Sequence, residues 1–150
     1  MNYYNYHKHD HKGNIRQLDV IAKMEDYCKR AVELGHNAIF TTNHGVQGDI
    51  FEATTLGKQY GLKVISGCEC YYVQNRHEKD KSNKHLVVIA LNDNGFRQLN
   101  KILSIANDDG YYYKPRVDYE LIMQLNPNDV VITTACISGI LYEKECPQTI

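Results

Sequence analysis

The chain has 150 residues, of which 43% are hydrophobic and 23% charged, with 17 basic and 18 acidic side chains. This is the composition of a soluble domain with its own core, and a net charge of −1 predicts no general attraction to nucleic acid or anionic membranes. No apolar run approaches the roughly 20 residues that cross a bilayer, and the first residues lack the pattern of a signal peptide. The 5 cysteines include no C-x-x-C pair, which is typical of reduced thiols, so we expect a cytoplasmic protein without a membrane segment.

Apolar periodicity divides the chain into alternating helices and strands. In chain order it predicts a helix over residues 26–34, a strand over 38–42, a helix over 49–60 and a strand over 62–73 that is interrupted at Gly67. A polar exposed loop over 74–84 follows, then a strand over 86–91, helices over 94–106 and 119–125, and a strand over 130–134. Strands that alternate with helices are typical of an α/β fold with a parallel sheet, and about five strands are too few to close a barrel.

Potential metal ligands recur beside these predicted strands. The carboxyl ends of parallel strands meet at one face of an α/β sheet, so side chains placed there would gather into one site. Imidazole, carboxylate and thiolate groups together suit a cluster of zinc-like or manganese-like ions. The candidates are His7, His9, Asp19, His44, Glu69, His85 and Cys136.

The H-x-H at His7 and His9 places two imidazoles on the same side of an extended segment, because side chains alternate with period two. Both could then reach one ion or two neighbouring ions. His11 continues the alternation and could replace either of them. A surface tract of histidine and lysine explains the pattern as well.

His44 and Glu69 are placed by two different strands. His44 follows an apolar strand in a turn, where it could bind an ion or only satisfy a hydrogen bond of the turn. Glu69 lies within an apolar strand, on the face opposite Cys68 and Cys70. A carboxylate buried there needs a partner, and either a metal or a basic side chain would serve.

Asp19, His85 and Cys136 each have a second interpretation. Asp19 could cap the helix that follows it. His85 begins its strand rather than ending it, which is more typical of a structural histidine. Cys136 follows the last strand and could be a ligand or a buried thiol.

The segment Tyr111-Tyr112-Tyr113-Lys114-Pro115-Arg116 mixes aromatic and cationic side chains. Tyr112, Lys114 and Arg116 could contact nucleic acid by stacking and by charge, although a packed loop explains the segment as well. The chain has no Gly-rich phosphate loop, no G-x-S-x-G turn, and no evident aspartate pair for nucleotidyl transfer.

Taken in order, these residues resemble the polymerase and histidinol phosphatase (PHP) family, and most closely the amino-terminal PHP domain of the bacterial or phage DNA polymerase III alpha subunit. The resemblance covers nearly the whole chain. The matching motifs are the H-x-H at His7 and His9, Thr42-Asn43-His44-Gly45, Gly67-Cys68-Glu69-Cys70-Tyr71, the run from His85 to Ala90, the run from Gly110 to Arg116, and the late strand ending in Cys136.

The resemblance implies an incomplete PHP-type (βα) barrel over residues 1–150, without the carboxy-terminal part of the barrel and the polymerase core. It implies up to three divalent ions, of zinc, manganese, iron or magnesium, held by the seven candidates named above. It further implies phosphodiester hydrolysis of the 3′–5′ exonuclease type in some members, with DNA and the rest of the polymerase or replisome as partners. A phosphatase of the histidinol phosphatase type and a scaffold without catalysis stay open.

The chain departs from the family pattern at three places. Asn43 stands where the family usually has aspartate, and Gly13 stands where it often has serine. The late D-x-H ligand motif of the family is missing from these 150 residues. On this ground we expect these 150 residues by themselves to be inactive as a polymerase and as a phosphodiesterase, and to lack part of the family's metal site. The missing motif favours the scaffold alternative for this piece.

Overall fold

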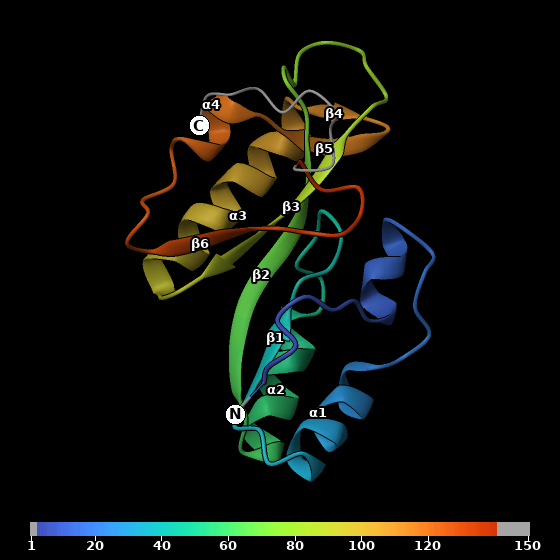
Figure 1. Cartoon of the computed structure of the whole chain (residues 1–150), viewed down its shortest axis with the longest axis vertical. Coiled ribbons are helices and arrows are strands. Elements are labelled where there is room, and N and C mark those ends of the chain that lie inside the picture. Colours follow the sequence, from blue (N-terminus) through green and yellow to red (C-terminus); the bar gives the residue numbers. More distant parts are fainter. Residues whose placement is uncertain (1–2, 141–150) are drawn as a thin grey trace.

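The computed structural model describes residues 3–140, which form one open, mixed sheet with helices packed against it (Figure 1). The strands of this region are β1 (Ala38–Thr41), β2 (Lys63–Tyr72), β3 (Lys84–Ala90), β4 (Tyr111–Tyr112), β5 (Lys114–Val117) and β6 (Val130–Thr134). The helices are the 3-10 turn η1 (His11–Ile15), α1 (Met24–Glu33), α2 (Ile50–Tyr60), α3 (Asp93–Asp108) and α4 (Tyr119–Ile122). None of these helices has the length and apolar character needed to span a bilayer.

The sheet has the order β4-β5-β2-β3-β6, and β1 pairs with the first half of β2. The predicted parallel pairing is correct for β1 with β2 and for β2 with β5, but β3 runs antiparallel to both β2 and β6. Residues 73–83 join β2 to β3 without a helix, and such a connection returns the chain antiparallel to itself. Since β2 and β6 are both antiparallel to β3, these two strands run in the same direction.

The predicted interruption of the second strand at Gly67 is wrong, because β2 is continuous. Glycine is needed here for close packing rather than for a break. A Cβ at this position would lie 2.8 Å from the Val88 carbonyl oxygen and 3.0 Å from Cγ2 of Thr42. The absence of a side chain therefore lets β2 lie against its neighbours on both sides.

The predicted helices are present, with small changes at their ends. The second ends as expected at Gly61, whose φ of 68° is in the left-handed region. The last is shorter than predicted, because turn bonds from Gln124 and Leu125 to residues three positions earlier replace the α-helical pattern. The segment from Tyr111 to Val117, for which no strand was predicted, forms the hairpin of β4 and β5.

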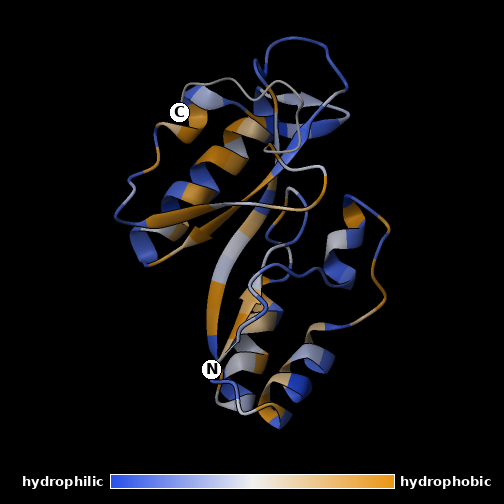
Figure 2. Cartoon of the chain, viewed as in Figure 1, coloured by the Kyte–Doolittle hydropathy of each residue, from blue (hydrophilic) through white to orange (hydrophobic). Residues whose placement is uncertain are grey.

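Two clusters of buried side chains hold the two ends of β2. One lies between α1, α2 and β1, and the other lies between α3, α4 and the strands β2, β3, β5 and β6. Figure 2 shows hydrophobic residues concentrated on α3 and β6, and polar residues in the loop that joins β2 to β3. That loop is exposed as predicted, except that Arg76 is buried and paired with Asp109, Asp118 and Glu120.

The described cysteines, Cys28, Cys68, Cys70 and Cys136, are free thiols, as expected, and Cys146 lies outside the described residues. The first three are buried in the core and the fourth is exposed. The first three therefore act as small apolar core residues.

Asp49, immediately before α2, is a buried acid with an unfavourable environment. It is 1% exposed, and neither of its carboxylate oxygens has a hydrogen-bond partner among the described residues. Burial and then the nearby charge of Asp10 raise its pKa from 3.8 to about 6, although the Lys8 ammonium opposes the shift. Folding therefore disfavours the ionised carboxylate, which is the form present above about pH 6.

Asp49→Asn is expected to stabilise the chain at neutral and higher pH. The contribution of Asp49 to stability is complete below its ordinary pKa of 3.8 and is lost as the pH rises through about 6. The loss amounts to at most about 3 kcal/mol, so the variant should gain roughly 1–2 kcal/mol above neutrality and nothing in acid. Urea unfolding of both proteins across this pH range would measure the difference. Equal stability of the two at all pH values would contradict the assignment.

Candidate metal centre

Alternation along β2 separates a polar face from the apolar core. Cys68 and Cys70 are fully buried in the core cluster of α3 and its strands. Glu69 and Tyr71 lie between and beyond them, so their side chains face the other side of the sheet. The prediction that the Glu69 side chain faces away from Cys68 and Cys70 is therefore confirmed.

Side chains at the end of β1 hold the H-x-H segment in place. The hydroxyl of Thr42 accepts a hydrogen bond from the Lys8 amide at 2.8 Å, and Oδ1 of Asn43 accepts one from the Asp10 amide at 2.9 Å. Lys8 and Asp10 are consequently buried, and the alternating His7 and His9 turn to the opposite side, toward Glu69. The fixed positions of these side chains exclude the alternative of a loose surface tract of histidine and lysine.

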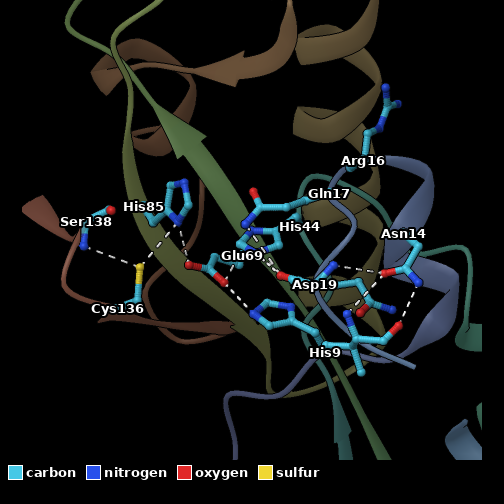
Figure 3. Close-up of polar contacts among 12 residues, drawn as sticks. His9, Asn14, Arg16, Gln17, Asp19, His44, Glu69, His85, Cys136 and Ser138 are labelled. Carbon is cyan, nitrogen blue, oxygen red and sulfur yellow. Dashed lines mark hydrogen bonds and ion pairs between the residues drawn. The ribbon is translucent and has the colours of Figure 1, made fainter. Parts of the chain in front are cut away.

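Four histidines surround the Glu69 carboxylate, and Figure 3 shows three of them, His9, His44 and His85. Its Oε2 lies 2.6 Å from Nε2 of His7, 2.9 Å from Nε2 of His9 and 3.4 Å from Nδ1 of His44. Its Oε1 lies 2.8 Å from Nδ1 of His85. The rings pack closely as well, since those of His9 and His44 are stacked with centroids 4.1 Å apart. The carboxylate is thus the centre of the arrangement.

Strand direction explains why His85 belongs to this group although it lies near the start of its strand. Because β3 is antiparallel to β2, His85 is paired directly with Tyr71, near the end of β2. The first residues of β3 and the last residues of β2 therefore meet at one edge. A position near the start of β3 is therefore compatible with a role for His85 as a ligand.

Asp19 lies beside His44 and does not cap the helix that follows it. The N-cap of α1 is Lys23, whereas Oδ2 of Asp19 is 3.2 Å from Nε2 of His44. Asp19 is also the most exposed carboxylate of the group, with 27% of its side chain accessible against 0% for Glu69. It therefore occupies the open side of the site.

Cys136 and His11 are less well placed than the other candidates. The Sγ of Cys136 lies 3.5 Å from Nδ1 of His85 and accepts a hydrogen bond from the Ser138 amide at 3.4 Å, and the residue is exposed. It therefore touches the cluster through one histidine and is not a buried thiol. His11 lies in η1 and is not part of the cluster.

The six remaining candidates form three overlapping groups of donors. In each group the ligand atoms lie within 4.8 Å of one another. The groups are His7, His9 and Glu69; His9, Asp19 and His44; and His44, Glu69 and His85. Imidazole and carboxylate in this ratio suit zinc, manganese or iron, and the donor atoms are close enough for bound ions to share ligands. The described residues therefore include a cluster that could hold metal.

The electrostatics of the cluster favour the ligand forms of its side chains. Burial by itself would raise the pKa of Glu69, but hydrogen bonds from His7, His85 and His9 outweigh burial and hold that pKa well below its usual range. Burial lowers the pKa of His44 from 6.5 to about 4, although the Glu69 charge opposes this. At neutral pH the site therefore presents an ionised carboxylate and a neutral imidazole, the forms that bind metal.

A sequence model of the PHP domain matches residues 7–143 of this chain. The chain belongs to the PHP domain family. The family expected from the motifs is thereby confirmed.

Relatives of this PHP chain are large polymerase subunits. DNA polymerase III subunit alpha of Aquifex aeolicus is 34% identical over 134 residues, which is 82% of this chain and 12% of that protein. The subunit of the same name from Treponema pallidum is 32% identical over 141 residues, or 90% of this chain and 12% of that protein. The chain thus spans about an eighth of the length of these relatives.

Among solved structures, a Bifidobacterium adolescentis protein described as a metal-dependent phosphoesterase can be superposed on this chain. The superposition covers 57% of this chain and 28% of that protein. The TM-score is 0.41 and the sequence identity 16%. An overlap this small adds nothing to the argument.

Two departures from the PHP pattern, Asn43 and Gly13, contact each other in the structure. A Cβ at position 13 would lie 2.6 Å from Oδ1 of Asn43 and 2.9 Å from its Cγ. The Asn43 amide cannot move aside, because Asp10 accepts from its Nδ2 and donates to its Oδ1, both at 2.9 Å. Serine at position 13 would therefore have to displace the Asn43 side chain from these two hydrogen bonds.

Tyr71 is the residue of the PHP site that the sequence analysis missed as functional. Its ring stacks with His44 at a centroid distance of 5.8 Å and meets His85 edge-on at 5.2 Å. Tyr71 is 1% exposed, so it covers both imidazoles from one side. Its position two residues after Glu69 was a usable signal, because alternation puts both on one face.

The three candidates for nucleic-acid contact have different surroundings. Arg116 is 2% exposed and donates to the main-chain oxygens of Gly110, Arg76, Glu78 and Asp80, which gives it a structural role. Tyr112 is half-buried, with the Arg116 guanidinium over its ring. Lys114 is half-exposed and lies beside Tyr71.

Proposed function

We propose that this chain is the PHP domain of a replicative DNA polymerase III alpha subunit and that its His/Glu cluster is a metal-dependent phosphodiesterase site of the 3′–5′ exonuclease type. The observation that carries the proposal is the buried, ionised Glu69 carboxylate with four imidazoles around it. Apolar residues in place of a buried ionic cluster are often as stable or more stable, so such a cluster favours a functional role, and a metal site needs this set of donors. The polymerase relatives support DNA and the replisome as partners.

The overlap of the three donor groups suits several neighbouring ions. Glu69 belongs to two of the groups, and its two carboxylate oxygens could serve two ions. His9 and His44 also belong to two groups each, but a neutral imidazole has one acceptor nitrogen and would bind one ion. Asp19 and His7 would complete the set at its outer side, and Cys136 would join it next to His85. Bound divalent ions would lower the pKa of a water and neutralise phosphoryl oxygens.

The chain's own residues would fix the geometry in which hydrolysis takes place. Thr42 and Asn43 hold the H-x-H segment through its main chain, so His7 and His9 keep their position without a bound ion. Tyr71 covers His44 and His85 and keeps water away from their rings on that side. Asp19, the exposed member, leaves the opposite side open to a phosphodiester.

Metal content and substrate length together test the proposal. Elemental analysis of the purified chain should find more than one equivalent of zinc, manganese or iron, and a His9→Ala variant should lose most of it. The manganese-loaded chain should shorten a 5′-labelled single-stranded oligonucleotide from its 3′ end, at least about 100-fold faster than the variant. It should leave p-nitrophenyl phosphate untouched.

The other outcomes identify the alternatives. Hydrolysis of p-nitrophenyl phosphate alone would make the chain a small-molecule phosphatase. Bound metal without either activity would leave a scaffold domain. A folded chain that binds no metal would contradict the metal centre itself.

A further inference from the structure

Lys114 is a cation at the margin of the metal centre, and it has no acidic partner among the residues that the structure describes. Its Nζ donates to the Arg16 carbonyl oxygen at 3.1 Å and to the Tyr71 hydroxyl at 3.4 Å. An ammonium has three donors, so one remains for a ligand. Within residues 3–140 Lys114 forms no ion pair, whereas Lys12 pairs with Glu52 and Lys29 pairs with Glu25. It therefore presents an uncompensated charge to solvent.

Tyr71 connects this charge to the metal centre. Its ring contacts His44 and His85, and its hydroxyl end contacts Lys114, whose Nζ is 4.9 Å from the ring centroid. The Tyr71 ring thus separates the Lys114 ammonium from the imidazoles of His44 and His85. An anion bound at a metal-loaded centre would be flanked by Lys114 rather than held by it.

Arg16 adds a second cation on the same side. Its guanidinium donates to Oδ1 of Asn107 on α3 at 2.7 Å, and among the described residues it too has no ion pair. Figure 3 shows its side chain pointing away from the Glu69 cluster. Arg16 also lines a cleft of about 400 Å³ that begins at Gly45, next to His44, and continues along Asn100 and Ser104 of α3.

The β4–β5 hairpin places exposed aromatic rings beside these cations. Tyr111 is 53% exposed and lies 6.0 Å from the Arg16 guanidinium, and Tyr113 is 61% exposed. Exposed aromatic rings next to cations are the features on which proteins stack the bases of single strands. A phosphomonoester of small size would use neither the rings nor the second cation.

We propose that Lys114 and Arg16 bind the backbone phosphate that neighbours the one under attack, with a base stacked on Tyr111, so that the site selects single-stranded polynucleotides. This rests on the proposed phosphodiesterase function and names its substrate class. The sequence pattern suggested Tyr112 and Arg116 as contacts to nucleic acid, but their side chains are engaged within the fold. Tyr111 and Arg16 take that role in this proposal. Lys114 is common to both sets.

Binding of a strand that resists hydrolysis tests the proposal apart from turnover. The probe is a phosphorothioate-linked, labelled oligothymidylate of about ten nucleotides, followed by fluorescence anisotropy with the manganese-loaded chain. Lys114→Met keeps the aliphatic stem over Tyr71 and removes the charge. Its Kd should rise about five- to tenfold, and the slope of log Kd against log salt should fall by about 0.7. Lys114→Arg should recover most of the loss.

Matched variants control for general effects. Lys58→Met removes an exposed lysine from the end of α2, far from the hairpin, and should bind as the unaltered chain does. Tyr111→Ala, at an exposed position, should weaken binding about fivefold or more and keeps the proposal testable if Lys114→Met does not fold. Thymidine monophosphate, as competitor, should bind all of these variants equally.

Equal Kd values for Lys114→Met and Lys58→Met would overturn the proposal. Equal weakening of thymidine monophosphate and the oligonucleotide would also overturn it, because Lys114 would then hold the reacting phosphate. Neither result depends on whether the chain hydrolyses DNA. Failure of the phosphodiesterase proposal would instead appear as absence of metal or of turnover in the unaltered chain.

Discussion

Replacing Glu69 with glutamine is expected to abolish metal binding while leaving the chain folded. The carboxylate lies within 2.9 Å of nitrogens of His7, His9 and His85 and is fully buried. Glutamine has nearly the same shape and can both accept hydrogen bonds from imidazole and donate to it, so the packing should survive. Its amide carries no charge, so metal affinity should fall by more than the roughly 10–100-fold that loss of a supporting residue causes.

Thermal unfolding with and without manganese measures this effect. An ion present at about 100 times its Kd stabilises the folded state by about 2.7 kcal/mol, which should raise the Tm of the unaltered chain by roughly 5–10 °C. Glu69→Gln should show no such rise. Glu33→Gln makes the same chemical change at an exposed position of α1 and should keep the full rise. A full rise in Glu69→Gln would remove Glu69 from the ligands and the proposed centre with it.

Those parts of the site that depend on local alternation could be predicted from the sequence. The period-two rule puts Glu69 opposite Cys68 and Cys70, and His7 opposite Lys8, and both relations hold in the structure. The helix that ends at Gly61 follows in the same way from the apolar pattern and from glycine's freedom to adopt positive φ. In each case the information lies within a few neighbouring residues.

The direction of a strand is not contained in such a pattern. An apolar run such as that of β3 reads the same for either direction, so His85 was expected at the wrong end of its strand for a ligand. The pairing of His85 with Tyr71 and its contact with Glu69 at 2.8 Å place it in the site. The contact of Asn43 with Asp10 is equally hidden, since the two residues are 33 positions apart and neither position suggests the other.

Returning position 43 to the family's usual aspartate is expected to destabilise this chain. Asn43 donates from Nδ2 to Oδ1 of Asp10 at 2.9 Å, and both residues are buried. Aspartate in its place would bring two carboxylates together and leave one of them without its donor. The cost of a buried, uncompensated charge is about 3 kcal/mol or more, which corresponds to a fall in Tm of roughly 6–12 °C.

A double-mutant cycle separates this repulsion from a mere loss of packing. Asp10→Asn combined with Asn43→Asp exchanges amide and carboxylate across the same contact, and it should regain at least half of the stability that Asn43→Asp loses. Urea unfolding of the four proteins at neutral pH gives the coupling, which we expect to exceed about 1 kcal/mol in favour of the exchanged pair. Strictly additive effects would show that the two side chains do not interact.

Since Gly13 packs directly on Asn43, a large coupling would mean that this PHP chain carries its own set of mutually adapted residues beneath the H-x-H segment. The family's aspartate could then return only together with a change at Asp10.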